Sequence, residues 1–186
     1  MAIYQYNIEF IPRKSILDKY GEIPNRLYID HDALKDHLEK DNLESNYDFD
    51  DAFTIRWWEE RKILFSEIEP TIISFEKPVE WLKDSADLRR YGNEATNDLT
   101  FVLTEDGLIE DFGCRINISI LDKNFIDNIF TLAKQIDCLL IDRKGNLFEP
   151  TYDKLFENIK QSNSFKFVSN PTDFFDKLSS GQIKPE

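Results

Sequence analysis

Few residues in this 186-residue chain could build the sites that most often identify a protein from its sequence. It contains two cysteines, two histidines and six glycines, and its 36 acidic side chains outnumber 23 basic ones. Two cysteines are too few for a disulfide framework, and scattered glycines form no phosphate-binding loop. A formal charge of −13 would repel a phosphate backbone. We therefore expect no nucleic-acid partner.

Long apolar runs are also missing from the sequence. The longest runs, such as Cys138 to Ile141, have four residues, whereas a membrane-spanning helix needs about 20 apolar residues. The chain begins without the basic start and continuous apolar stretch of a secretory signal. We expect no membrane association and a cytoplasmic location, in which Cys114 and Cys138 stay reduced in the core.

The histidines and aspartates do not fall into a metal-binding or catalytic pattern. His31 and His37 are six residues apart, so a helix would point them to different sides. The acids from Asp48 onward have the charge of a calcium loop, but Phe53 occupies the sixth position, where that loop needs glycine. No Gly-x-Ser-x-Gly motif is present. We predict no metal, no cofactor and no catalytic residue from these patterns.

Negative charge is concentrated in residues 30–51, where nine acids and two lysines give a net charge of −7. Such a segment is either a solvated surface that keeps the protein soluble or a binding surface for a basic partner. Two tryptophans follow it, and aromatic side chains beside charges are typical of interface anchors. Core packing is the other role expected for at least one of them. The candidate partner-binding residues are Asp32, Asp36, Glu39, Asp41, Glu44, Asp48, Asp50, Asp51, Trp57 and Trp58.

Alternating apolar and polar residues predict several strands. The clearest signal is a hairpin in which Asp106-Gly107 supplies the turn between residues 99–104 and 108–120. Proline 12 should end the first strand, and residues 71–75, between two prolines, suit a short strand or a loop. The other predicted strands are residues 3–11, 138–141 and 147–148.

Apolar residues at helical spacing predict the helices. Asp122 is a suitable N-cap for a helix over residues 123–135, and Gly21 should end a short helix over residues 15–20. Further helices are expected after Thr151 and from Pro171 to Gly181. The periodicity of residues 53–65 fits a helix or a strand, and we favour a helix around Trp57 and Trp58. Strands mixed with helices in this order predict an α+β fold: an antiparallel-rich sheet with helices packed mainly on one face. We expect one domain over residues 1–186, with 84–98 as the alternative boundary.

A family resemblance involves the later half of the chain. Its features are residues 97–107, Arg115-Ile116-Asn117-Ile118, residues 136–140, Gly145, Glu149-Pro150, Phe165-Lys166-Phe167-Val168 and Asn170-Pro171, together with Gly21-Glu22-Ile23-Pro24 near the start. This pattern, over about residues 75–178, resembles small cytosolic bacterial proteins of uncharacterised function and immunity proteins of contact-delivered toxin systems. The resemblance implies an α+β fold and neutralisation of a cognate toxin.

These observations lead to three functional hypotheses. The first is a non-enzymatic acidic protein-binding module, an immunity-type inhibitor that covers a basic toxin or nuclease through steering by the acids and anchoring by one exposed tryptophan. The alternatives are an enzyme of unknown chemistry and a metabolite-binding regulatory domain. An enzyme should have a deep pocket with converging polar groups, whereas a binding module should have a flat or convex acidic face.

Overall fold

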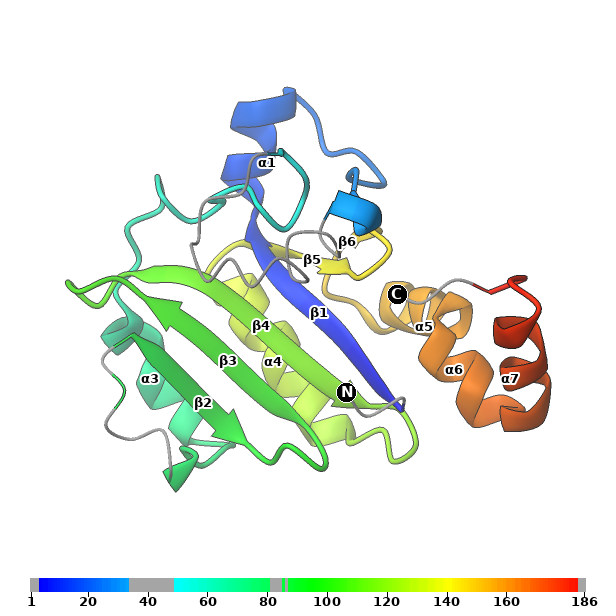
Figure 1. Ribbon diagram of the computed structural model, residues 1–186. Coiled ribbons are helices and arrows are strands. Elements are labelled where there is room, and N and C mark those ends of the chain that lie inside the picture. The colour runs from blue at the N-terminus through cyan, green and yellow to red at the C-terminus, as the bar shows by residue number, and fades with distance from the viewer. Residues whose placement is uncertain (1–3, 34–48, 81–84, 86, 184–186) are drawn as a thin grey trace.

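A six-stranded antiparallel sheet forms the centre of the computed structural model, which describes residues 4–33, 49–80, 85 and 87–183 (Figure 1). The strand order is β2-β3-β4-β1-β5-β6, and every neighbouring pair is antiparallel. The strands are β1 (Gln5–Pro12), β2 (Leu88–Gly92), β3 (Asp98–Leu103), β4 (Ile109–Asn117), β5 (Cys138–Asp142) and β6 (Leu147–Phe148).

Helices α3 and α4 cover one face of this sheet and lie behind the strands in Figure 1. Helices α5, α6 and α7 follow one another beyond β1, to the right of the sheet in that view. The helices are α1 (Arg13–Tyr20), α3 (Phe65–Ile73), α4 (Lys123–Gln135), α5 (Tyr152–Gln161), α6 (Asn163–Ser169) and α7 (Pro171–Ser179). The predicted α+β fold is therefore confirmed.

Aromatic side chains fill the covered side of the sheet. Phe112 of β4 stacks on Phe10 of β1 and on Phe101 of β3, with ring centroids 3.7 and 4.2 Å apart. They belong to one buried cluster that also contains Ile129 and Leu132 of α4. This cluster includes residues that precede and residues that follow 84–98, the alternative domain boundary considered above. Side chains alternate along a strand, so the neighbours of these phenylalanines point to the other side, which we call the open face.

The β3–β4 hairpin has the turn predicted from the sequence, but its second strand is shorter. The β3–β4 hairpin turns at Gly107, whose φ of 75° is favoured by glycine. Its second strand ends at Asn117, earlier than predicted, because the Asn117 side chain accepts a hydrogen bond from the Ser119 amide and begins a turn. This turn leaves Ile120 exposed instead of on the apolar face of the strand.

Two other expectations for the first half of the chain are wrong. Residues around Trp57 and Trp58 form turns instead of a helix. Residues 71–73, expected in a strand or loop, continue α3 although Pro70 lies inside that helix. A proline removes one helical hydrogen bond, but α3 buries Phe65, Ile68 and Ile72 at helical spacing, and this packing favours the helix. Strand β2 and helix α6 had no predicted counterpart.

The N-cap of α4 allows a direct test of the sequence analysis. Asp122 Oδ1 accepts hydrogen bonds from the amides of Asn124 and Phe125, at 2.9 and 3.2 Å. We expect Asp122→Ala to lower the free energy of unfolding by about 1 kcal/mol, measured by urea denaturation. Thr151→Ala is the control, because the Thr151 side chain makes no capping hydrogen bond to α5. Equal losses in the two variants would contradict the capping role of Asp122.

Candidate functional site

The predicted partner-binding residues divide into three groups in the structure. Asp32 and Asp50 are exposed, as a binding surface requires. Three others, Asp51, Trp57 and Trp58, are buried. The remaining five, Asp36, Glu39, Asp41, Glu44 and Asp48, lie outside the described residues.

The Asp51 side chain forms hydrogen bonds with backbone amides and does not lie on the surface. Its side chain is 2% exposed and accepts hydrogen bonds from the amides of Phe53, Thr54 and Asp30, at 2.7, 3.1 and 3.1 Å. A buried carboxylate needs such donors because burial removes its contact with water. Asp51 therefore joins the two described ends of the acidic segment, and its expected place at a contact surface is corrected.

The expected exposed tryptophan is not found either. Trp57 is 7% exposed and Trp58 is 2% exposed. Trp57 Nε1 donates to the carbonyl of Ala52 at 2.7 Å, and Trp58 Nε1 donates to the carbonyl of Phe10 at 3.1 Å. Because both indole N–H groups find backbone acceptors, both rings can be buried at little polar cost. These residues build the core, and their anchoring role is corrected.

Charged side chains gather on the open face, around a cavity of about 230 Å³. Glu9 of β1 lies directly opposite Gly113 of β4, and Asp111 is two residues before Gly113 on the same side of that strand. Arg143, in the turn after β5, places Nη2 3.5 Å from Glu9 Oε1. The side chains of three elements thus converge on one small cavity.

Gly113 leaves space in the lining of this cavity. A Cβ added there would have its nearest neighbours, Glu9 Cγ and the Ile8 carbonyl oxygen, 4.0 Å away. Glycine weakens the interior of a strand and often marks a place where another group comes close to the backbone. The floor of the cavity between Glu9 and Asp111 is therefore open backbone.

Both carboxyl groups beside Gly113 are in an unfavourable environment for negative charge. Burial, together with the charges of Asp111 and Asp51, raises the pKa of Glu9 to about 8, although the charge of Arg143 lowers it. Burial also raises the pKa of Asp111, against the Phe112 amide and Arg143. Two carboxyl groups that share a site cannot both ionise easily. Glu9 therefore keeps its proton to a higher pH than an ordinary glutamate does.

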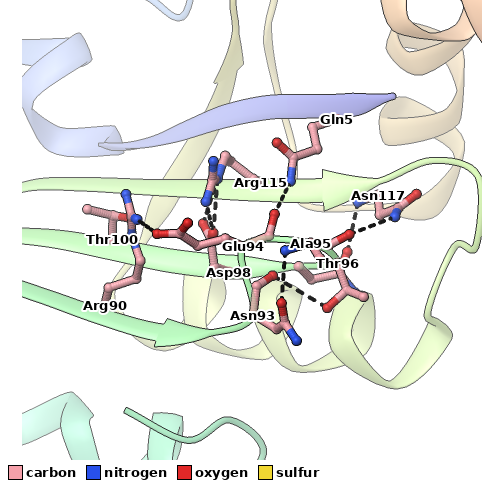
Figure 2. A network of polar contacts seen from close by, with 11 residues as sticks. Gln5, Arg90, Asn93, Glu94, Ala95, Thr96, Asp98, Thr100, Arg115 and Asn117 are labelled. Carbon is pink, nitrogen blue, oxygen red and sulfur yellow. Dashed lines mark hydrogen bonds and ion pairs between the residues drawn. The ribbon is translucent and has the colours of Figure 1, made fainter. Parts of the chain in front are cut away.

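The other end of the open face has balanced charges. Arg115 Nε lies 2.9 and 3.0 Å from the two carboxylate oxygens of Asp98, and Arg90 pairs with Glu94. Figure 2 shows these pairs, the hydrogen bond from Arg90 to Thr100, and the β2–β3 turn that supports them. The cavity lining has three carboxyl groups and three arginines. Because two of these arginines have their own carboxylate, Glu9 and Asp111 share Arg143.

Arg143 connects the open face with the acidic segment. Its guanidinium carbon lies 4.8 Å from the centre of the Phe53 ring, a cation–π distance. Phe53 is two residues after Asp51, whose charge acts on Glu9. The pKa of Tyr28 is raised by its hydrogen bond to Asp30 and by the charges of Asp30, Asp51 and Asp32. The described part of the acidic segment therefore adjoins the Glu9 end of the open face.

Sequence reasoning missed Glu9 and Asp111. Glu9 follows the normal alternation of a half-buried strand, and Asp111 is one of 36 acids, so neither residue stands out. The glycine in the middle of β4 was the available signal, because a strand interior seldom contains one without a reason. The pairing of β1 with β4, which brings the residues together, depends on the tertiary fold.

A larger cavity, of about 580 Å³, lies between β6 and α5. Its lining combines apolar residues such as Leu139 and Phe148 with the amide side chains of Asn25, Asn158 and Gln161. Its three charged residues have ion-pair partners, because Lys154 Nζ lies 2.9 Å from Glu157 Oε2 and Arg13 Nη2 lies 2.7 Å from Glu149 Oε2. The other polar side chains of the lining are neutral amides.

Comparisons with protein-family models, with curated proteins and with solved structures found no match. Within the described residues, no helix is long and apolar enough to cross a membrane. The same part of the chain contains no group of three or more histidine, cysteine or acidic side chains placed to hold a metal ion. The chemistry of the open face and its acidic neighbours is thus the basis for a functional proposal.

Proposed function

We propose that this protein is a non-enzymatic binding module for a basic protein, acting as an immunity-type inhibitor that covers a toxin or nuclease. The main support is the position of the unbalanced acids. Asp32 and Asp50 are exposed, and the segment that carries them adjoins Glu9 and Asp111 through Phe53 and Arg143. Together with a net charge of −13, this surface has the electrostatic character that attracts a basic partner.

The proposed mechanism is electrostatic attraction followed by steric blocking. Complementary charges speed the encounter of two proteins and favour the correct orientation, and salt weakens both effects. A nuclease needs a basic surface to hold the phosphate backbone of its substrate. A protein with an acidic face can occupy that surface and exclude the nucleic acid. This action requires no catalytic residue in the inhibitor.

The test uses the basic protein encoded by the adjoining gene, because an immunity protein is expected beside its toxin. Co-production should protect cells from that protein, and calorimetry should detect a complex. We expect affinity to fall at least about tenfold between about 50 mM and about 400 mM salt, because added salt screens exposed charges. An affinity that does not change with salt would contradict the electrostatic mechanism.

A charge-reversal variant makes the test specific to the proposed surface. Asp32→Lys combined with Asp50→Lys should weaken the complex by roughly 10- to 100-fold, mainly through slower association. The matched control is Glu105→Lys combined with Asp106→Lys, in the exposed β3–β4 turn, which makes the same change in net charge at another place. Equal weakening by both double variants would show that net charge matters and that the proposed surface does not.

The cavity between β6 and α5 favours a second candidate, metabolite binding. Its volume of about 580 Å³ falls in the range typical of small-molecule sites. Asn158 lines it from the buried side of α5, and an amide is a good group for orienting a neutral polar ligand. Stabilisation by a small neutral metabolite that is lost in Asn158→Leu and independent of salt would favour this candidate.

A further inference from the structure

We infer that the cavity over Gly113 receives one lysine or arginine side chain of the basic partner, which enters between the carboxyl groups of Glu9 and Asp111. This inference rests on the proposed function and names the contact at its centre. It goes beyond a general acidic surface because it assigns recognition to a single cavity, which is lined by residues of β1, β2, β3, β4 and the turn after β5.

The first argument is that the Glu9 carboxyl group lacks a close donor. Its ion pair with Arg143 is 3.5 Å long, whereas charge-assisted hydrogen bonds to a carboxylate are about 2.7–2.9 Å long. Within the described residues, no hydrogen bond to the Glu9 carboxyl group is found. Only 20% of the Glu9 side chain is exposed, so water can satisfy this group only in part.

The second argument is the space beside that carboxyl group. The cavity has a volume of about 230 Å³, which exceeds the requirement of a guanidinium or ammonium group. The missing side chain at Gly113 gives such a group access to the backbone between Glu9 and Asp111. Two carboxyl groups on either side of an open floor match a planar guanidinium with several N–H donors.

The third argument is the charge balance around Glu9. The charged groups that act on it are Asp111 from β4, Arg143 from the turn after β5, and Asp51 from the segment after the acidic run. Arg90 and Arg115 also line the cavity, but they pair with Glu94 and Asp98. Arg143 is thus the one cation acting on Glu9, against the charges of Asp111 and Asp51. A second cation would restore the balance and lower the pKa of Glu9 from about 8, so Glu9 would ionise as the cation binds.

The inference predicts a definite pH dependence. Below the pKa of free Glu9, the entering cation must displace a proton, so the dissociation constant should increase by up to about tenfold for each pH unit. Affinity should therefore rise from pH 6 to pH 8 and become constant above that. Simple surface attraction predicts little change in this range, because the exposed aspartates are already ionised.

The experiment is an NMR titration with N-acetyl-arginine amide, observed at the Gly113 amide, at pH 6, 7 and 8. We expect saturable shifts and a dissociation constant that improves at least tenfold between pH 6 and pH 8. The neutral analogue N-acetyl-citrulline amide, which has nearly the same shape, should cause no such shift. Glu9→Gln should remove the pH dependence, and the exposed Glu105→Gln should retain it. Because Glu9→Gln removes only a group that resists ionisation, we expect it to fold normally.

The outcomes separate this inference from the proposed function. Equal shifts with the arginine and citrulline probes, or an unchanged pH dependence in Glu9→Gln, would overturn the cation site even if the basic protein binds. If the arginine probe binds as expected, it should also compete with the basic protein. Binding of that protein that is insensitive to a saturating probe would overturn the assignment of the cavity to a partner side chain.

Discussion

Phe112→Ala is expected to lower the free energy of unfolding by about 3–5 kcal/mol, because it leaves a large cavity where two aromatic stacks meet. Phe112 is fully buried and stacks on Phe10 and Phe101. Neighbouring strands cannot close such a gap without losing their hydrogen bonds. Urea denaturation followed by tryptophan fluorescence measures the loss of stability. Trp58 reports on this part of the core because its Nε1 donates a hydrogen bond to the carbonyl of Phe10.

The control for this variant is Phe175→Ala on α7. Phe175 is 50% exposed and lies in T-shaped arrangements with the rings of Phe167 and Phe174, so we expect a loss of about 1 kcal/mol or less. A similar small loss for Phe112→Ala would contradict the stacked core. The result also concerns the site, because Phe10 follows Glu9 and Phe112 separates Asp111 from Gly113. The stack therefore fixes the strands that position both carboxyl groups.

The elements that could be predicted from sequence are those with local signals. The β3–β4 hairpin needed a turn with positive φ at Gly107, and α4 needed a capping side chain at Asp122. Both requirements are met within a few residues and do not depend on the rest of the fold. The edge strand β2 lacked such a signal, because its Leu88-Arg-Arg-Tyr-Gly sequence does not alternate clearly. It pairs with β3 as part of the tertiary fold.

The candidate site was harder to predict, because a high number of acidic residues in a segment does not determine which of their side chains are exposed. Asp51 and Asp50 are neighbours of the same type, yet Asp51 is buried by its hydrogen bonds with backbone amides and Asp50 is exposed. Trp57 and Trp58 likewise follow an acidic run but bond to backbone carbonyls. Local sequence indicated where acids concentrate, and only the tertiary fold decides which of them can meet a partner.

The open face itself contains a buried ion pair, and breaking that pair should have an effect as large as removal of the aromatic stack. Asp98 is 1% exposed, and Arg115 is its ion-pair partner with a side chain that is 25% exposed. The hydrogen bonds to Asp98 raise the pKa of Arg115. If a buried carboxylate loses its cation, the free-energy cost of removing the carboxylate from water remains, and no ion pair offsets it. Arg115→Met should therefore lower the free energy of unfolding by about 3–5 kcal/mol.

A double-mutant cycle distinguishes the effect of charge from that of packing. Arg115→Met combined with Asp98→Leu replaces the pair by apolar side chains, and such replacement of a buried pair is often close to neutral. We expect the double variant to recover most of the stability lost in Arg115→Met. Lys177→Met is the control, because it breaks an exposed pair with Asp173 and should cost less than about 1 kcal/mol. If the double variant were as unstable as Arg115→Met, the loss would come from packing around Arg115, and the uncompensated charge of Asp98 would not explain it.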